Sequence, residues 1–111
     1  MATTNKTESL LGFAIKSGKI IFGTDNILFY KRSIYLILCD AGLSENARRK
    51  LAAYAGKGNI PVASPEIPLS QLVHRSGVKA AAVTDVNIAK AIVQLNIEYS
   101  IIKDDSSTPN S

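Results

Sequence analysis

The sequence predicts a single α/β domain in which helices cover both faces of a mixed four-stranded sheet, a three-layer α/β/α sandwich. Short apolar runs alternate along the chain with segments whose apolar residues recur at helical spacing, and such alternation is typical of a sheet covered by helices. The chain has 111 residues, a length that normally forms one domain around one core. Hydrophobic residues make up 46% of it and charged residues 20%, which argues against global disorder.

The first half of the chain predicts two helices and two strands. Residues 6–17 have helical apolar spacing after a capping arrangement, and Gly18 offers a stop. Residues 20–22 form a short strand, and the small polar residues after it open a short second helix that runs to Lys31. Residues 34–39 are apolar without alternation, which is typical of a strand buried on both faces, so we expect this strand at the centre of the sheet.

The second half continues the alternation with three helices and two strands. Ser44 caps a third helix, which two glycines end, and residues 60–63 form a strand. A short fourth helix begins at Pro68, residues 79–83 form a last buried strand, and Asp85 caps the fifth helix.

The two ends of the chain set the expected boundaries of the domain. We expect the ordered domain to span residues 1–102, and residues 103–111 to form a disordered tail because they are polar, contain proline and offer nothing to bury. The N-terminus lacks the apolar core of a signal peptide, and no segment approaches the ~20 apolar residues that span a bilayer. A cytoplasmic protein that does not enter the membrane is therefore expected.

Residues that commonly carry catalysis or bind metals are scarce. Cys39 is the one cysteine and lies in an apolar run, where a thiol behaves as a small hydrophobe, and His74 is the one histidine. We expect His74 at the surface or at a helix end, so a Cys–His pair would require Cys39 to leave the core. The sequence thus predicts no catalytic residues, no metal site and no cofactor.

The charge of the chain favours an anionic partner. The formal net charge is +4, a modest excess that a basic, soluble surface also explains, so the positions of the cations must decide. One candidate position is the turn after the first strand, where free backbone N–H groups suit a phosphate, although an ordinary strand-to-helix turn has the same residue types. This turn consists of Gly23, Thr24, Asp25 and Asn26, and the cations that flank it in sequence are Lys16, Lys19, Lys31 and Arg32.

A second candidate position is the loop between the fourth helix and the last strand. It contains Arg75, Ser76, Gly77, Val78 and Lys79, and in a sandwich of this order it can lie at the same end of the sheet as Gly23. Val78 would then contact a splayed base while Arg75 and Lys79 contact phosphates, although a plain connector explains these residues equally well. The run of Arg48, Arg49 and Lys50 is expected to form the solvated outer face of the third helix. Contact with RNA is the alternative, although a basic stripe without aromatic or loop neighbours is a weak motif.

Five segments stand in an order and spacing that characterise a known family. They are residues 10–26 (LLGFAIKSGKIIFGTDN), 35–39 (YLILC), 43–46 (LSEN), 60–62 (IPV) and 82–85 (AVTD). Together they resemble the bacterial members of the kink-turn-binding ribosomal protein family, the L-seven-Ae/L-thirty-e type, over about residues 5 to 95. The resemblance implies a three-layer α/β/α fold, no enzymatic activity and binding to structured RNA, typically the kink-turn with its tandem sheared G·A pairs.

The resemblance also implies which residues contact RNA. In the family, the turn and first residues of the second helix read the G·A bases, and the loop before the last strand packs on the bases flipped out at the kink. These roles carry over here to the 23–26 turn and the 75–78 loop, with Lys79 beside the loop. The residues predicted to bind RNA are therefore Lys19, Gly23, Thr24, Asp25, Asn26, Lys31, Arg75, Ser76, Gly77, Val78 and Lys79.

The sequence departs from the family at two positions of the RNA site and in the length of the stretch that follows it. The family usually has a lysine three residues after the position of Asn26, and here Phe29 stands there; Asp25 is acidic where asparagine or a basic residue is common. The stretch from Gly23 to the central strand is also about three residues shorter than in the family, so either the second helix is truncated or Lys31 supplies the missing cation. Our first hypothesis is a monomeric, non-catalytic protein that binds structured RNA, such as ribosomal RNA, rather than DNA, in a ribosome or another ribonucleoprotein. The alternative is a domain of the same fold that has lost the RNA site and binds a protein partner through a surface that includes Phe29.

Overall fold

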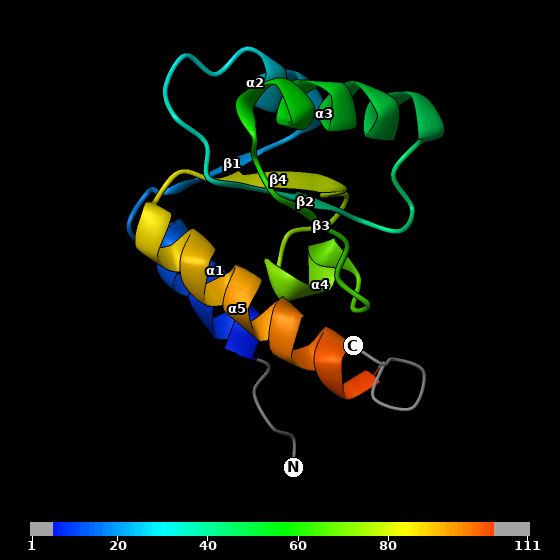
Figure 1. Ribbon diagram of the computed structural model, residues 1–111. Coiled ribbons are helices and arrows are strands. Elements are labelled where there is room, and N and C mark those ends of the chain that lie inside the picture. Colours follow the sequence, from blue (N-terminus) through cyan, green and yellow to red (C-terminus); the bar gives the residue numbers. More distant parts are fainter. Residues whose placement is uncertain (1–5, 104–111) are drawn as a thin grey trace.

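Figure 1 shows the computed structural model of the protein, which describes residues 6–103, and the side chains of residues 6–95. Helices and strands alternate along this part of the chain. Their bounds are α1 (Lys6–Lys16), β1 (Ile20–Phe22), α2 (Thr24–Leu28), β2 (Leu36–Cys39), α3 (Glu45–Gly58), β3 (Val62–Ala63), α4 (Leu69–Leu72), β4 (Ala80–Val83) and α5 (Val86–Lys103).

The strands form one mixed sheet in the order β1-β4-β2-β3. β4 runs antiparallel to both of its neighbours, β1 and β2, whereas the edge strand β3 is parallel to β2. Every residue of β2 and of β4 is buried, as expected for strands that are covered on both faces. The strand predicted at the centre of the sheet is thus one of two central strands, and it begins at Leu36 rather than at Ile34.

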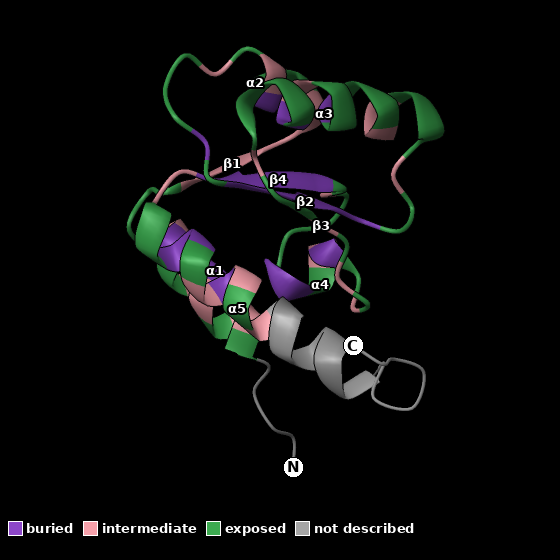
Figure 2. Ribbon diagram, viewed as in Figure 1, coloured by how far each residue is buried: buried purple, intermediate pink, exposed green. Residues whose placement is uncertain are grey.

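The helices form a layer on each face of the sheet, so the predicted α/β/α sandwich is confirmed (Figure 1). α2 and α3 lie on one face, and α1, α4 and α5 lie on the other. Side chains alternate between the two faces of β2: Leu36 and Leu38 pack under α1 and α5, whereas Ile37 and Cys39 pack under α3. Figure 2 shows that burial is concentrated in the two central strands and on the inner sides of the helices.

Two predicted helix caps are confirmed by hydrogen bonds. The Ser44 hydroxyl accepts a bond of 3.2 Å from the backbone N–H of Ala47, and one carboxylate oxygen of Asp85 accepts bonds from the N–H groups of Asn87 and Ile88. The prediction that two glycines end α3 is wrong, because both glycines lie inside the helix. The left-handed position that ends α3 is taken by Asn59, with φ 55°, a conformation that asparagine tolerates better than most residues.

The second helix ends before Lys31, which is one of the two possibilities left open by the short stretch between Gly23 and the central strand. α2 stops at Leu28, and the N–H of Tyr30 bonds to the carbonyl of Ile27, which tightens the last turn. Residues 29–35 then lead back to the start of β2, so Lys31 lies outside the helix in which we expected it. The predicted C-terminal tail lies, apart from Lys103, outside the described residues. None of the helices within residues 6–103 combines the length and apolar character that crossing a bilayer requires.

Candidate functional site

Two segments that lie far apart in the sequence meet at one end of the sheet. β1 ends where β4 begins, since Phe22 pairs with Ala81, and the N–H of Gly23 donates a 3.0 Å hydrogen bond to the carbonyl of Ala80. The 23–26 turn therefore lies beside the loop that leads into β4, residues 75–79. The sequence predicted this juxtaposition, and it is confirmed. We call these two segments together the two-loop surface.

The backbone of the 23–26 turn depends on a glycine and an asparagine. Gly23 adopts φ 97°, which L residues rarely adopt, and a Cβ there would come within 3.5 Å of the Asn26 side chain. The amide nitrogen of that side chain donates a 2.9 Å hydrogen bond to the carbonyl of Phe22. Asn26 thus closes the turn with its side chain, whereas the side chain of Asp25 is exposed.

The 75–79 loop is held against the sheet by contacts at both of its ends. The guanidinium of Arg75 lies over the ring of Phe22, 4.6 Å from its centre, which is the geometry of a cation–π contact. Just before the loop, His74 adopts φ 56° and its ring forms a 2.6 Å hydrogen bond with the carboxylate of Glu8 on α1. Val78 is half-buried against the core under α1 and α5, so only part of its side chain is open to a ligand.

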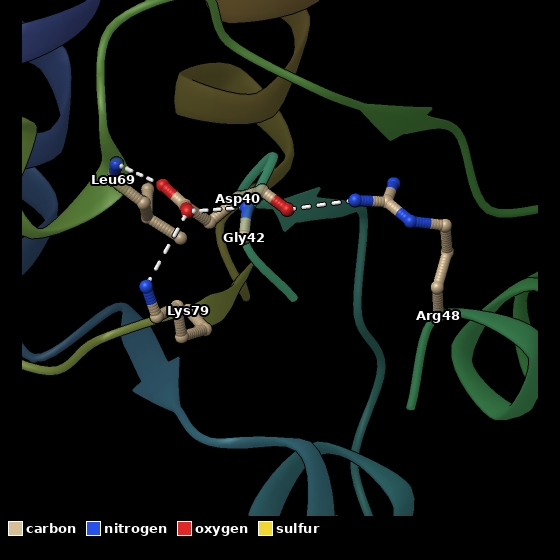
Figure 3. A network of polar contacts seen from close by, with 5 residues as sticks. All are labelled: Asp40, Gly42, Arg48, Leu69 and Lys79. Carbon is tan, nitrogen blue, oxygen red and sulfur yellow. Dashed lines mark hydrogen bonds and ion pairs between the residues drawn. The ribbon is translucent and has the colours of Figure 1, made fainter. Parts of the chain in front are cut away.

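A buried carboxylate, Asp40, ties this end of the sheet together (Figure 3). Asp40 follows β2 and is 7% exposed; one of its oxygens accepts a 2.6 Å bond from the N–H of Leu69, and the other accepts a 2.8 Å bond from the N–H of Gly42. The first bond supplies α4 with a cap, which Pro68 has no side-chain group to provide. These two backbone bonds lower the pKa of Asp40, and the charges of Lys79 and Arg48 lower it further, against the opposing effect of burial.

Asp40 also fixes the last residue of the two-loop surface. Its N–H donates a 2.8 Å bond to the carbonyl of Lys79, and its carboxylate lies 3.8 Å from the Lys79 ammonium, whose side chain is 53% exposed. The backbone of Lys79 is thereby anchored, while its ammonium still faces solvent. Sequence reasoning missed Asp40; the one signal available was a carboxylate directly after a buried strand.

The expectation that Arg48 faces solvent is wrong. Its guanidinium turns back toward the sheet and donates a 2.7 Å bond to the carbonyl of Asp40 (Figure 3). Its second amino group lies 3.5 Å from the hydroxyl of Ser64. Arg48 therefore connects α3 to the ends of β2 and β3. Its neighbours Arg49 and Lys50 are exposed, as predicted.

Two predicted RNA contacts, Lys19 and Lys31, do not reach the two-loop surface. Lys19 precedes β1 and accepts a backbone bond from Thr84, which follows β4, so it lies at the opposite end of the sheet from Gly23. Lys31 lies in the 29–35 connection, which returns to that same opposite end (Figure 1). For Lys19 the physical reason is that β1 separates the residues before it from those after it by its full length. Lys31 belongs instead to the connection that leads from α2 back to the start of β2. Of the predicted cations, Arg75 and Lys79 are the ones that the fold brings to the two-loop surface.

The structure separates the one cysteine from the one histidine. Cys39 is buried on the α3 side of the sheet, whereas His74 is exposed on the other side, beside α1. Burial raises the pKa of the Cys39 thiol, and the charge of Arg48 opposes this only in part. Within the part of the chain that the structure describes, no group of three or more His, Cys, Asp or Glu side chains is placed to hold a metal ion.

We expect Cys39 to be inert toward a disulfide reagent such as Ellman's reagent in native protein near neutral pH. Its burial hinders access, and the raised pKa keeps the thiolate, which is the reactive form, scarce. Absorbance should report one thiol only after the protein unfolds in urea. Rapid labelling in plain buffer would contradict the packing of β2 described above.

Comparison with known proteins adds information on the fold. No family model matches the chain, and no curated protein matches it. Among solved structures, the chain is similar to a protein of unknown function from Bacillus halodurans C, with a TM-score of 0.70 and 18% sequence identity over 83% of this chain and 97% of the other. At this identity the likeness supports the small α/β domain with a mixed four-stranded sheet, and nothing about function.

Proposed function

We propose that the protein binds structured RNA through the two-loop surface, without catalysing a reaction, as a component or partner of a ribosome or another ribonucleoprotein in the cytoplasm. The observation that carries the proposal is the meeting of the 23–26 turn and the 75–79 loop at one end of the sheet. In the family that the sequence resembles, the segments corresponding to these two contact the RNA. A kink-turn, with its bent backbone and flipped bases, is the RNA that such a surface fits.

Each part of the two-loop surface has a role in this proposal. Arg75 keeps N–H donors at the edge of its planar group while its face lies on Phe22, so it can contact a phosphate without losing its orientation. The ammonium of Lys79 supplies a second phosphate contact, and the open part of Val78 supplies an apolar surface for an unstacked base. The backbone of the 23–26 turn lies beside them and faces the sheared pairs.

A titration against two RNAs tests the proposal. The purified protein is titrated with a kink-turn RNA and with a straight duplex of equal length, at two salt concentrations. We expect tighter binding to the kink-turn at both concentrations, because shape and base contacts are less sensitive to salt than phosphate contacts. Equal and equally salt-sensitive binding to both RNAs would contradict a kink-selective site.

The variant Val78→Asp tests the loop directly. We expect it to weaken kink-turn binding about tenfold or more, because a carboxylate replaces the apolar contact and repels the phosphates beside Arg75 and Lys79. A matched control is Val62→Asp, which makes the same change of charge at an exposed position of the edge strand β3 and should keep kink-turn affinity within about twofold. Urea unfolding of both variants separates binding from stability, and full affinity in Val78→Asp would show that the loop is not part of the site.

A second candidate function, binding to a protein partner, is favoured by Phe29. This side chain follows α2 and is 76% exposed, which is unusual for a phenylalanine. Recovery of one partner from RNase-treated extract by the wild type, and its loss with Phe29→Ser, would favour this function. Recovery that disappears with RNase would instead favour RNA binding.

A further inference from the structure

Six of the twelve Lys and Arg residues whose side chains the structure describes lie at the end of the sheet opposite the two-loop surface, and one carboxylate accompanies them. We call this the far end: it comprises the starts of β1 and β2, the end of β4, and the segments that adjoin them. Its cations are Lys16, Lys19, Lys31, Arg32, Lys57 and Lys90. Among the described residues there, Asp85 is the one carboxylate, and it is engaged in capping α5. The far end is therefore the more electropositive of the two.

At the two-loop surface, by contrast, carboxylates offset the positive charge. This surface contains the exposed carboxylate of Asp25 as well as the cations Arg75 and Lys79, and the Asp40 carboxylate lies 3.8 Å from the Lys79 ammonium. The positive potential available to a polyanion is thus partly cancelled there. A net charge of +4 for the chain consequently acts mainly through the far end.

A groove of about 420 Å³ opens at the far end, between residues 32–35 and the turn from α3 to β3. The residues that line it include Arg32, Tyr35, Tyr54 and Asn59. A second groove of about 360 Å³ shares Tyr35 and Pro61 with the first and has Lys90 in its wall. The two neighbouring grooves thus share an aromatic residue and a proline, and each has a cation among its lining residues.

This combination matches the chemistry of single-stranded nucleic acid. Aromatic rings and guanidinium planes stack with bases of any sequence, and amides bond to base edges, while cations along the path contact successive phosphates. Tyr35 is 39% exposed, so part of the residue is open for stacking. Its backbone N–H donates a hydrogen bond to the carbonyl of Val83, which fixes its position beside the sheet. An acidic peptide would use the cations but leave the two grooves and the ring between them without a role.

We propose that the far end binds an unpaired stretch of an RNA strand, with successive bases in the two grooves on either side of Tyr35 and phosphates on Lys31, Arg32 and Lys90. This site is separate from the two-loop surface and does not depend on kink-turn recognition. It gives Lys31 an RNA contact, as the sequence predicted, but at a different place. Lys19, before the edge strand β1, adds positive charge to the same end of the sheet.

Oligouridine of eight nucleotides, labelled for fluorescence anisotropy, is a suitable probe because it has no secondary structure. We expect the double variant Lys31→Gln/Arg32→Gln to bind it about tenfold more weakly than the wild type, with a shallower dependence on salt. The matched control, Arg49→Gln/Lys50→Gln, removes the same two charges from the exposed face of α3 and should stay within about twofold of the wild type. Tyr35→Ser should weaken binding about fivefold or more, whereas Tyr35→Phe keeps the stacking ring and most of the affinity.

Two outcomes would overturn the site. An equal loss in both double variants would mean that the number of charges matters and their position does not. Binding of a polyglutamate peptide of equal charge, at least as tight as that of oligouridine, would mean that the far end binds acidic polymers without using its grooves. A kink-turn RNA without single-stranded ends is titrated in parallel, so that failure of the two-loop surface, with oligouridine binding intact, is recognised as a separate result.

Discussion

The Asp40→Ala variant is expected to lose about 2–4 kcal/mol of its free energy of unfolding, measured by urea denaturation. The carboxylate accepts bonds from two backbone N–H groups, and the one from Leu69 is buried. After truncation this buried donor keeps its loss of hydration without an acceptor in return, which is the costly way to break a hydrogen bond. The ion pair with Lys79 adds little, because the ammonium is half exposed to solvent.

Two further variants serve as controls, with smaller expected losses of unfolding free energy. Asp25→Ala removes an exposed carboxylate from the 23–26 turn and should change the free energy of unfolding by no more than about 0.5 kcal/mol. Asp40→Asn keeps one acceptor oxygen but turns an NH2 group toward the other donor, so an intermediate loss is expected. If Asp40→Ala were no less stable than Asp25→Ala, the proposed role of Asp40 as the cap of α4 would be wrong.

The stabilisation by Asp40 also has a defined dependence on pH. The backbone bonds lower its pKa in the folded protein, so the unfolded chain, with an ordinary aspartate pKa of about 3.9, binds the proton more readily. Its contribution is therefore complete above that ordinary value and is lost as the pH falls through the lower folded pKa. The difference in unfolding free energy between the wild type and Asp40→Asn should shrink over this acidic range and stay constant near neutral pH.

The layers of the fold could be predicted from the sequence, because hydrophobic periodicity reports directly which face of each element is buried. The continuous apolar run of β2 and the caps at Ser44 and Asp85 are local signals of this kind, and the structure confirms them. The antiparallel pairing of β1 with β4 then brought the two predicted loops together. Topology and local pattern were sufficient to predict that the two loops meet, although the long-range contacts of Glu8 and Asp40 help to hold the second loop in place.

The polar contacts could not be predicted in the same way. Asp40 caps a helix that begins at Leu69, and Arg48 bonds to the carbonyl of Asp40, and neither partner is marked in the sequence. A helical wheel placed Arg48 on the solvated side because it cannot show that a long side chain turns back over the end of a strand. Lys19 was misplaced for a simpler reason. β1 has three residues, which extend over about 10 Å, so the cation before the strand and the turn after it stand at opposite ends of the sheet.

The same limit applies to α2, where two apolar residues that are close in sequence have opposite environments. Ile27 is fully buried and is the one buried residue of α2, whereas Phe29 directly follows the helix and is 76% exposed. A helix of five residues has little stability of its own, so α2 depends on packing against the sheet and α3. Ile27 is therefore the residue that keeps the 23–26 turn in place beside the 75–79 loop.

The variant Ile27→Ala is accordingly expected to lose about 2–5 kcal/mol of unfolding free energy, measured by urea denaturation. Relative to the wild type, the rate of amide hydrogen exchange should also increase more in α2 than in β2 or β4. The reason is that the helix loses its anchor while the central strands keep theirs. Phe29→Ala is the matched control: it removes a larger apolar side chain two residues away, yet the change should stay within about 0.5 kcal/mol because that side chain is already in water. Equal losses in the two variants would mean that burial of Ile27 is not what anchors α2. A large loss for Ile27→Ala alone, accompanied by weaker kink-turn binding in protein that is still folded, would connect the anchoring of this short helix to the shape of the two-loop surface.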